Sequence, residues 1–133
     1  MKELLRIHVK ITGCDTVKGG VQTVHMLHFT GECSSACFQG RTLPGGVDTQ
    51  SFMPDGHGTL SARYILEGVD GSGLPCRLFI ENNAVLRPCE AAITHPRITT
   101  DSEALRPLET MTLTGRIKDT AEGVDIIIGT VDE

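Results

Sequence analysis

Hydrophobic and polar side chains alternate along much of this chain, which is the pattern of β-strands that bury one face. The alternation is clearest near the N-terminus, where polar residues separate Leu5, Ile7, Val9 and Ile11. Further runs of this kind predict strands at 21–30, 35–43, 47–52, 59–69 and 76–81, the longest being 59–69. A hairpin with strands at 110–117 and 124–128 is predicted to follow. Because the strands succeed one another without long helices between them, an alternating β-α-β layout is excluded.

Glycine, proline and asparagine mark the expected breaks between these strands. Turns are predicted at 13–20, 53–58, 70–73, 119–123 and the pair Asn82-Asn83. The segment 84–107 is expected to be irregular, because prolines are excluded from the middle of a sheet. Its prolines are Pro88, Pro96 and Pro107. Thr100-x-x-Glu103 has the spacing of a capping box, which predicts one or two helical turns that stop before Pro107.

About eight successive strands predict an all-β fold, either a sandwich or a barrel. We favour a small closed antiparallel β-barrel, because closure removes the unpaired edges that a small open sheet must protect. The 133 residues suit a single domain over 1–133. Hydrophobic residues make up 39% of the chain and aromatic residues 4%, so the core is expected to be aliphatic.

Charge and cysteine content narrow the range of partners. The net charge is −5 and no basic cluster appears, which argues against a nucleic-acid partner. No apolar run approaches the roughly 20 residues of a membrane helix, and charges interrupt the N-terminus too early for a signal peptide. The five cysteines are odd in number, and reduced thiols in the cytoplasm explain them most simply. We therefore expect a cytoplasmic protein without a membrane partner.

Two strands are hydrophobic on both faces, namely Leu78-Phe79-Ile80 and Ile126-Ile127-Ile128. A barrel buries only one face of each strand, so the second face needs a separate cover. We expect a homo-oligomer that packs through the outer wall of the barrel, with Ile127 in the interface. The alternative is that the 84–107 segment wraps over the same surface.

One stretch of the chain resembles a known family. The stretch begins with Gly40-Arg41-Thr42-Leu43-Pro44-Gly45-Gly46-Val47-Asp48 and continues with Leu60-Ser61-Ala62-Arg63-Tyr64 and Glu67-Gly68-Val69-Asp70-Gly71. It is similar to the bacterial domain of unknown function 3237, and the similarity is densest from Gly40 to Asn82. The resemblance implies a small antiparallel barrel of the lipocalin-like type, similar in shape to allene oxide cyclase. It implies no established activity.

The candidate ligand-binding residues are Asp48, Gln50, Arg63, Tyr64 and Glu81. Asp48 and Gln50 share one strand face, and polar groups that project into a barrel are the usual build of a small-ligand site. Arg63 lies in mid-strand, where a buried charge needs a carboxylate such as Asp48 or Glu81. Tyr64 belongs to the strand that carries the family resemblance. The plainer reading of these charges is a solvent-exposed or structural ion pair.

Other kinds of chemistry find less support. Glu81 at the barrel mouth can serve as a general base if burial raises its pKa, but a hairpin turn at Asn82-Asn83 with Glu81 as its solvated flank is the preferred explanation. Cys33 and Cys37 have no matched second pair, and His25 and His28 point to opposite faces, so no metal is expected. No nucleophile elbow or phosphate-binding glycine loop occurs, and no cofactor is expected.

These observations leave three candidate functions. The leading one is a barrel that binds a small, largely apolar metabolite as carrier or sensor. The second is an enzyme of the cyclase or isomerase kind, which needs only a shaped cavity and a few orienting polar groups. The third is an oligomeric interaction module with a filled barrel.

Overall fold

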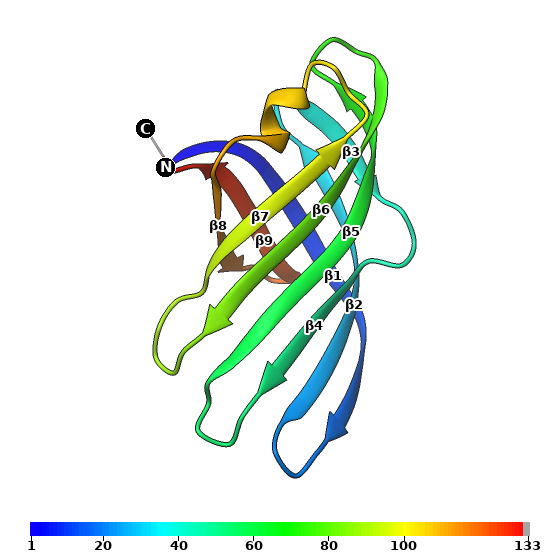
Figure 1. Ribbon diagram of the computed structural model, residues 1–133. Coiled ribbons are helices and arrows are strands. Elements are labelled where there is room, and N and C mark those ends of the chain that lie inside the picture. The colour runs from blue at the N-terminus through cyan, green and yellow to red at the C-terminus, as the bar shows by residue number, and fades with distance from the viewer. Residues whose placement is uncertain (132–133) are drawn as a thin grey trace.

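In the computed structural model, the described residues are 1–131, and they form nine strands and one short 3₁₀ helix (Figure 1). The strands are β1 (Lys2–Lys18), β2 (Thr23–Ser34), β3 (Phe38–Thr42), β4 (Val47–Phe52), β5 (Gly58–Asp70), β6 (Pro75–Leu86), β7 (Ile93–Thr100), β8 (Leu113–Asp119) and β9 (Gly123–Thr130). The helix η1 spans Arg106–Glu109. Across 1–131, no helix has the length and hydrophobicity that a membrane span requires.

The strands form one closed antiparallel barrel, which confirms the predicted fold. β1 pairs with β9 on one side and with β2 on the other, and this last pairing closes the sheet into a barrel. β3 and β4 occupy one place between β2 and β5, and nine strands therefore fill eight positions. The chain leaves the wall between them at 43–46. Gly45 has a φ of +107° there, a backbone conformation that favours glycine.

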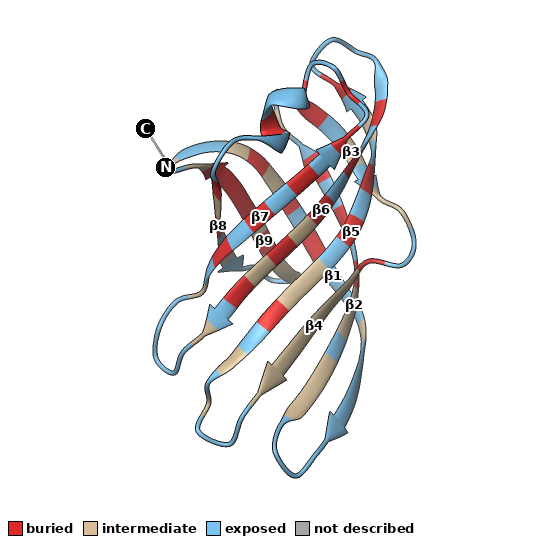
Figure 2. Cartoon of the chain, in the orientation of Figure 1, coloured by how far each residue is buried: buried red, intermediate tan, exposed pale blue. Residues whose placement is uncertain are grey.

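The hydrophobic core fills one end of the barrel. Its fully buried side chains are Leu5, Ile7, Phe38, Leu66, Leu78, Ile80 and Ile128. Figure 2 shows how buried and exposed residues alternate as bands along the strands. Leu105 and Leu108 close this end from the segment around η1. The core is mainly aliphatic, as the composition predicted.

A hydrogen-bonded turn holds this closing segment in place. Ser102 Oγ donates to Asp70 Oδ2 at 2.7 Å and accepts from the Leu105 N–H at 3.1 Å. The Ser102 bond and two backbone N–H bonds hold the pKa of Asp70 below its usual range. The helix predicted from Thr100 and Glu103 is wrong in its position: Thr100 ends β7, and η1 begins at Arg106 and includes Pro107. Proline fits there because the first helical residues need no N–H donor.

The opposite end of the barrel is open. The β1–β9 ladder ends at Lys10 and Gly123, whereas the β1–β2 ladder continues to Lys18 and Thr23. Likewise β6 pairs with β7 only as far as Asn83, while β5 and β6 stay paired to Leu86. Strands β1, β2, β4, β5 and β6 therefore extend beyond β7–β9, as the lower part of Figure 1 shows. We call the inner face of this extension the open end.

Three predicted breaks are in fact strands. The 13–20 turn is the second half of β1, where a bulge between Ile11 and Gly13 shifts the register, so β1 rather than 59–69 is the longest strand. Asn82 and Asn83 lie within β6, and 84–107 contributes β7. Pro96 is tolerated because β7 pairs with β8 only at Ile93 and Thr94, which leaves it a ladder on one side, as in an edge strand.

The outer wall needs less cover than the sequence predicted. Ile127 is only 9% exposed within the single chain. It lies in register between Arg6 and Arg116, whose long side chains share the outer face. The single chain therefore already covers Ile127 without a partner, and a charge placed there is expected to destabilise the monomer itself. Phe79, in contrast, is 37% exposed.

Candidate functional site

Polar side chains gather on the inner face where the solid core gives way to the open end. Asp48 is in register with Ala62, and Ala62 with Asn82, so Asp48 and Asn82 share a row on β4 and β6. Neighbouring strands lie about 4.8 Å apart, so the backbones of β4 and β6, with β5 between them, are about 10 Å apart. Tyr64 follows Ala62 on the same face of β5, one row deeper. Asp48, Asn82 and Tyr64 therefore all point into the interior of the barrel.

Asp48 is a carboxylate with one satisfied and one unsatisfied oxygen. Gln50 Nε2 donates to its Oδ2 at 2.9 Å. Its Oδ1 is buried and has no hydrogen-bond partner among residues 1–131. Burial raises the pKa of Asp48, and the Gln50 hydrogen bond offsets part of that rise. A half-buried carboxylate with a free oxygen can accept a hydrogen bond or a proton from a bound molecule.

Tyr64 brings a neutral hydroxyl into the same interior. Its side chain is 4% exposed, and its ring meets the ring of Phe29 edge-on at a centroid distance of 5.3 Å. Burial, with a smaller contribution from Cys33 and Asp48, raises the pKa of Tyr64 above its ordinary value. The hydroxyl therefore keeps its proton. Within the described chain its oxygen has no hydrogen-bond partner.

Asn82 and Thr94 complete this set, and neither was predicted from the sequence. They are 3% and 0% exposed, and Asn82 Oδ1 and Thr94 Oγ1 are also buried without a hydrogen-bond partner in 1–131. Thr94 lies against Gly115, where a Cβ would collide with the threonine hydroxyl. Asn82 was detectable: the inward alternation Cys76, Leu78, Ile80 continues through it to Ala84. Treating Asn82-Asn83 as a turn hid that signal.

A second pair of polar groups lies nearer the rim of the open end. Thr16 Oγ1 and His25 Nδ1 are 2.8 Å apart. His25 is in register with Gln50 on β4, and its ring meets Phe52 at 6.1 Å. Thr16 is exposed, whereas His25 and Phe52 are half-buried like Asp48. They frame the entrance rather than the interior.

The structure separates the five predicted residues into two groups. Asp48, Gln50 and Tyr64 face the interior, but Arg63 and Glu81 lie on the outer wall, which corrects the expectation that all five line one site. Arg63 Nη2 pairs with Glu81 Oε2 at 3.1 Å, and the Arg63 side chain is 64% exposed. Glu81 is thus the partner of Arg63, and Asp48 is not. Such an exposed pair contributes about 1 kcal/mol or less to stability.

Asp48→Asn is expected to stabilise the fold at pH 7 and to leave it unchanged near pH 3. The folded-state pKa of Asp48 is raised above the unfolded value of about 3.9, so the native state holds the proton of Asp48 more tightly than the unfolded state does. The native state therefore loses stability as the pH rises from the unfolded-state pKa to the folded-state pKa. The asparagine avoids this loss, about 1.4 kcal/mol for each pH unit by which the pKa is raised. Urea unfolding across pH 3–8 measures it; a stability difference that is constant with pH would contradict it.

Comparison with known proteins places residues 1–131 in one protein family. A family model described as "Protein of unknown function (DUF3237)" matches residues 1–131. The UPF0311 protein CA_C3321 of Clostridium acetobutylicum is 37% identical over 75 residues. That alignment covers 56% of this chain and 44% of the relative, so it spans less than half of the relative's length.

Solved structures share the barrel over nearly the full chain. A protein of unknown function from Clostridium acetobutylicum superposes with a TM-score of 0.82 at 23% identity, over 96% of this chain and 95% of that one. A structure described as an enzyme from Penicillium herquei superposes with a TM-score of 0.73 at 16% identity, over 96% and 92%. At these identities the likeness shows the fold alone.

Proposed function

Because this chain belongs to the DUF3237 family, which is described as having no known function, we propose a function from the interior of the barrel. The protein binds a small, largely apolar metabolite at the open end, as a carrier or sensor. The ligand lies against the row of Asp48, Ala62 and Asn82, above the floor that Phe29 and Tyr64 provide. In this proposal the protein needs no cofactor.

One observation carries this proposal. Four buried polar atoms point to the inner face of adjacent strands β4 to β7 and lack a protein hydrogen bond within the described chain: Asp48 Oδ1, Tyr64 Oη, Asn82 Oδ1 and Thr94 Oγ1. A buried polar atom left unsatisfied costs about 1–3 kcal/mol, and native proteins hold few of them. Four on one inner face of the barrel favour a bound molecule that satisfies those within its reach.

The chemistry of these atoms describes the ligand. Tyr64 can donate its O–H to a carbonyl or ether oxygen, while Asn82 Oδ1 and the ionised Asp48 can only accept, which suits a hydroxyl group on the ligand. The remaining lining is apolar, from Leu27, Leu60 and Ala62 on the same face. A compact molecule with an oxygenated edge and an apolar body fits this arrangement.

The test uses Nile red, a neutral and mostly apolar dye with one carbonyl acceptor. We expect its fluorescence to rise on binding to the purified protein. Ala62→Phe, which fills the open end, is expected to lower the affinity at least about tenfold, because the ring occupies the space of the dye. Tyr64→Phe is expected to lower it about 2- to 10-fold, the value of one hydrogen bond.

Ser61→Phe is the matched control, since Ser61 is the neighbour of Ala62 and lies on the opposite face of β5. It is expected to bind the dye like the wild type. Absence of dye binding by the wild type, or an equal loss in Ser61→Phe and Ala62→Phe, would refute binding at the open end.

A second candidate is an isomerase or cyclase acting at the same place. The observation that favours it is a carboxylate of raised pKa, Asp48, in the same interior as the undissociated hydroxyl of Tyr64. Asp48 would take a proton from the carbon beside a carbonyl, while Tyr64 donates to the carbonyl oxygen as it gains charge. The similar barrel from Penicillium herquei is described as an enzyme. An Asp48→Asn variant that binds substrate but no longer turns it over would distinguish the enzyme from the carrier.

We also propose that the protein works in the cytoplasm. All five cysteines are free thiols in the structure, which suits a reducing compartment. Reducing and non-reducing mass measurements of protein from intact cells test this, and a disulfide found in the cell would contradict it.

A further inference from the structure

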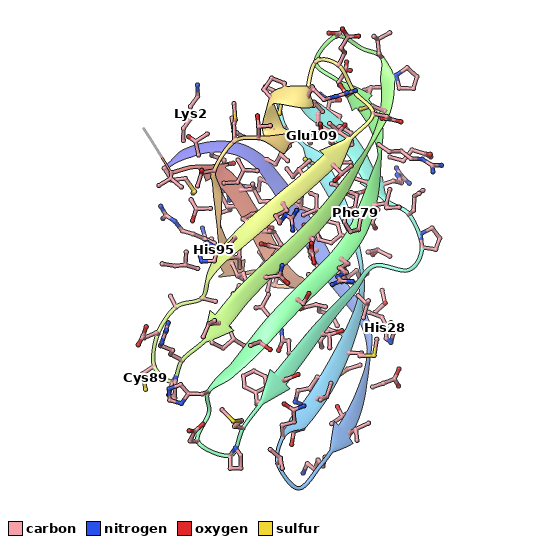
Figure 3. The ribbon with its side chains drawn as sticks, in the orientation of Figure 1. Lys2, His28, Phe79, Cys89, His95 and Glu109 are labelled. Atoms are coloured by element: carbon pink, nitrogen blue, oxygen red, sulfur yellow. The ribbon has the colours of Figure 1, made fainter. Side chains whose placement is uncertain are left out.

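The outer wall of the barrel carries an exposed apolar pair at its centre. Ile65 on β5 and Phe79 on β6 are directly opposite each other in register. They are 36% and 37% exposed, and Phe79 lies on the outer side of the wall in Figure 3. The sequence indicated that Phe79 needs a cover, and the segment 84–107 does not supply one, since it contributes β7 and the closing segment of the barrel.

An ion pair lies on each side of this apolar pair. In one the arginine belongs to β5 and the glutamate to β6, and in the other the order is reversed. On one side, Arg63 of β5 pairs with Glu81 of β6 at 3.1 Å. On the other, Glu67 of β5 pairs with Arg77 of β6, with Arg77 Nη2 2.8 Å from Glu67 Oε2. The four charges therefore alternate along each strand as well as across the two strands. Within this set of four the charges cancel, and on the flanking strands Arg97 of β7 and Arg41 of β3 lie in register with Glu81 and Glu67.

We propose that this face binds a second copy of the chain and forms a symmetric dimer, independently of any ligand in the barrel. In a twofold interface each patch must be complementary to itself. If the twofold axis runs along the strands, Arg63 meets Glu81 of the partner subunit, and Glu67 meets Arg77 of the partner subunit. If the axis runs across the strands, Arg63 meets Glu67 of the partner subunit, and Glu81 meets Arg77 of the partner subunit.

Either arrangement thus sets opposite charges against each other and stacks the Ile65 and Phe79 side chains of the two copies. An apolar centre with a charged rim is the usual anatomy of an interface. Like charges facing across an interface suppress wrong partners, so an alternating pattern of this kind selects its own copy.

The deciding experiment reverses all four charges in one chain: Arg63→Glu, Glu67→Arg, Arg77→Glu and Glu81→Arg. This reversed chain keeps both of its internal ion pairs and remains complementary to itself. Against the wild type, however, it places like charges opposite each other for both orientations of the axis. Because the four exchanges leave the mass of the chain unchanged, the reversed chain is labelled with ¹⁵N. Native mass spectrometry at low ionic strength, over a series of concentrations, is then expected to show wild-type homodimers and reversed homodimers at distinct masses.

In an equal mixture we expect the two homodimers with little or no heterodimer. A wild type that stays monomeric over the series, or heterodimers in the binomial proportion, would overturn the proposal. A thermal melt of the reversed chain confirms that it is folded, so that its failure to mix has one meaning.

A second variant tests the apolar centre without touching the charges. Phe79→Glu places a carboxylate between the two copies and is expected to convert the dimer to monomer, while the melting temperature measured at the lowest concentration stays close to that of the wild type. Val85→Glu on the same outer face of β6, also exposed and outside the patch, is the control and is expected to keep the dimer. A dimer that survives Phe79→Glu would place the interface elsewhere.

Discussion

Gly68→Ala is expected to leave little folded protein. Gly68 on β5 is in register with Gly40 on β3, and both backbones approach too closely for a side chain on either one. A Cβ at Gly68 would collide with the carbonyl oxygen of Gln39 and the Cα of Gly40. The obstacle is backbone in both cases, so no side-chain rotation can relieve it, and β3 would have to detach from β5.

We expect a loss of more than about 3 kcal/mol, at the upper end of what overpacking costs and a large part of the stability of a small domain. Thermal melting followed by circular dichroism measures it, together with the yield of soluble protein. Gly20→Ala is the matched control, because a Cβ at Gly20 meets nothing within 4 Å. If Gly68→Ala melts with the control, the close β3–β5 contact is wrong.

Phe38→Ala is expected to have a comparably large effect, about 3–5 kcal/mol. Phe38 is 1% exposed and is the largest of the fully buried side chains at the filled end of the barrel. Its removal leaves a cavity among aliphatic neighbours whose strands are tied on both sides by ladders, so the site cannot collapse to fill it.

Phe52→Ala serves as the comparison, since the same atoms are removed from a half-buried side chain at the open end. We expect it to cost less than half as much as Phe38→Ala in urea unfolding at pH 7. Equal costs would mean that the open end is packed as tightly as the core, which would also weaken the proposal that a ligand binds there.

The two ends of the barrel have different roles: one contains the core that stabilises the fold, and the other contains the candidate binding site. The filled end contains the buried aliphatic side chains and the closing segment with Leu105 and Leu108. The open end carries the unsatisfied polar atoms of Asp48 and Asn82. Stability therefore does not depend on filling the open end, and substitutions there are expected to change binding more than folding.

Much of the fold follows from local alternation alone. The inward sets Leu5, Ile7, Val9 and Leu60, Ala62, Tyr64, Leu66 were visible in the sequence, because side chains in a strand alternate between two faces whatever the strand pairs with. The same parity put Asp48 and Gln50 on one face. It also put Arg63 and Tyr64 on opposite faces, so no single interior could hold both.

The sequence by itself thus determined the all-β class, the approximate strands and the face of each side chain within its own strand. Only the tertiary structure decided which strands are neighbours and at what register, because those contacts join residues far apart in the chain. That register sets Asn82 in the same row as Asp48, with Ala62 between them, and Thr94 against Gly115, and it pairs Arg63 with Glu81 on the outside. It also makes β3 and β4 share one place and leaves one end of the barrel open, outcomes that no local pattern encodes.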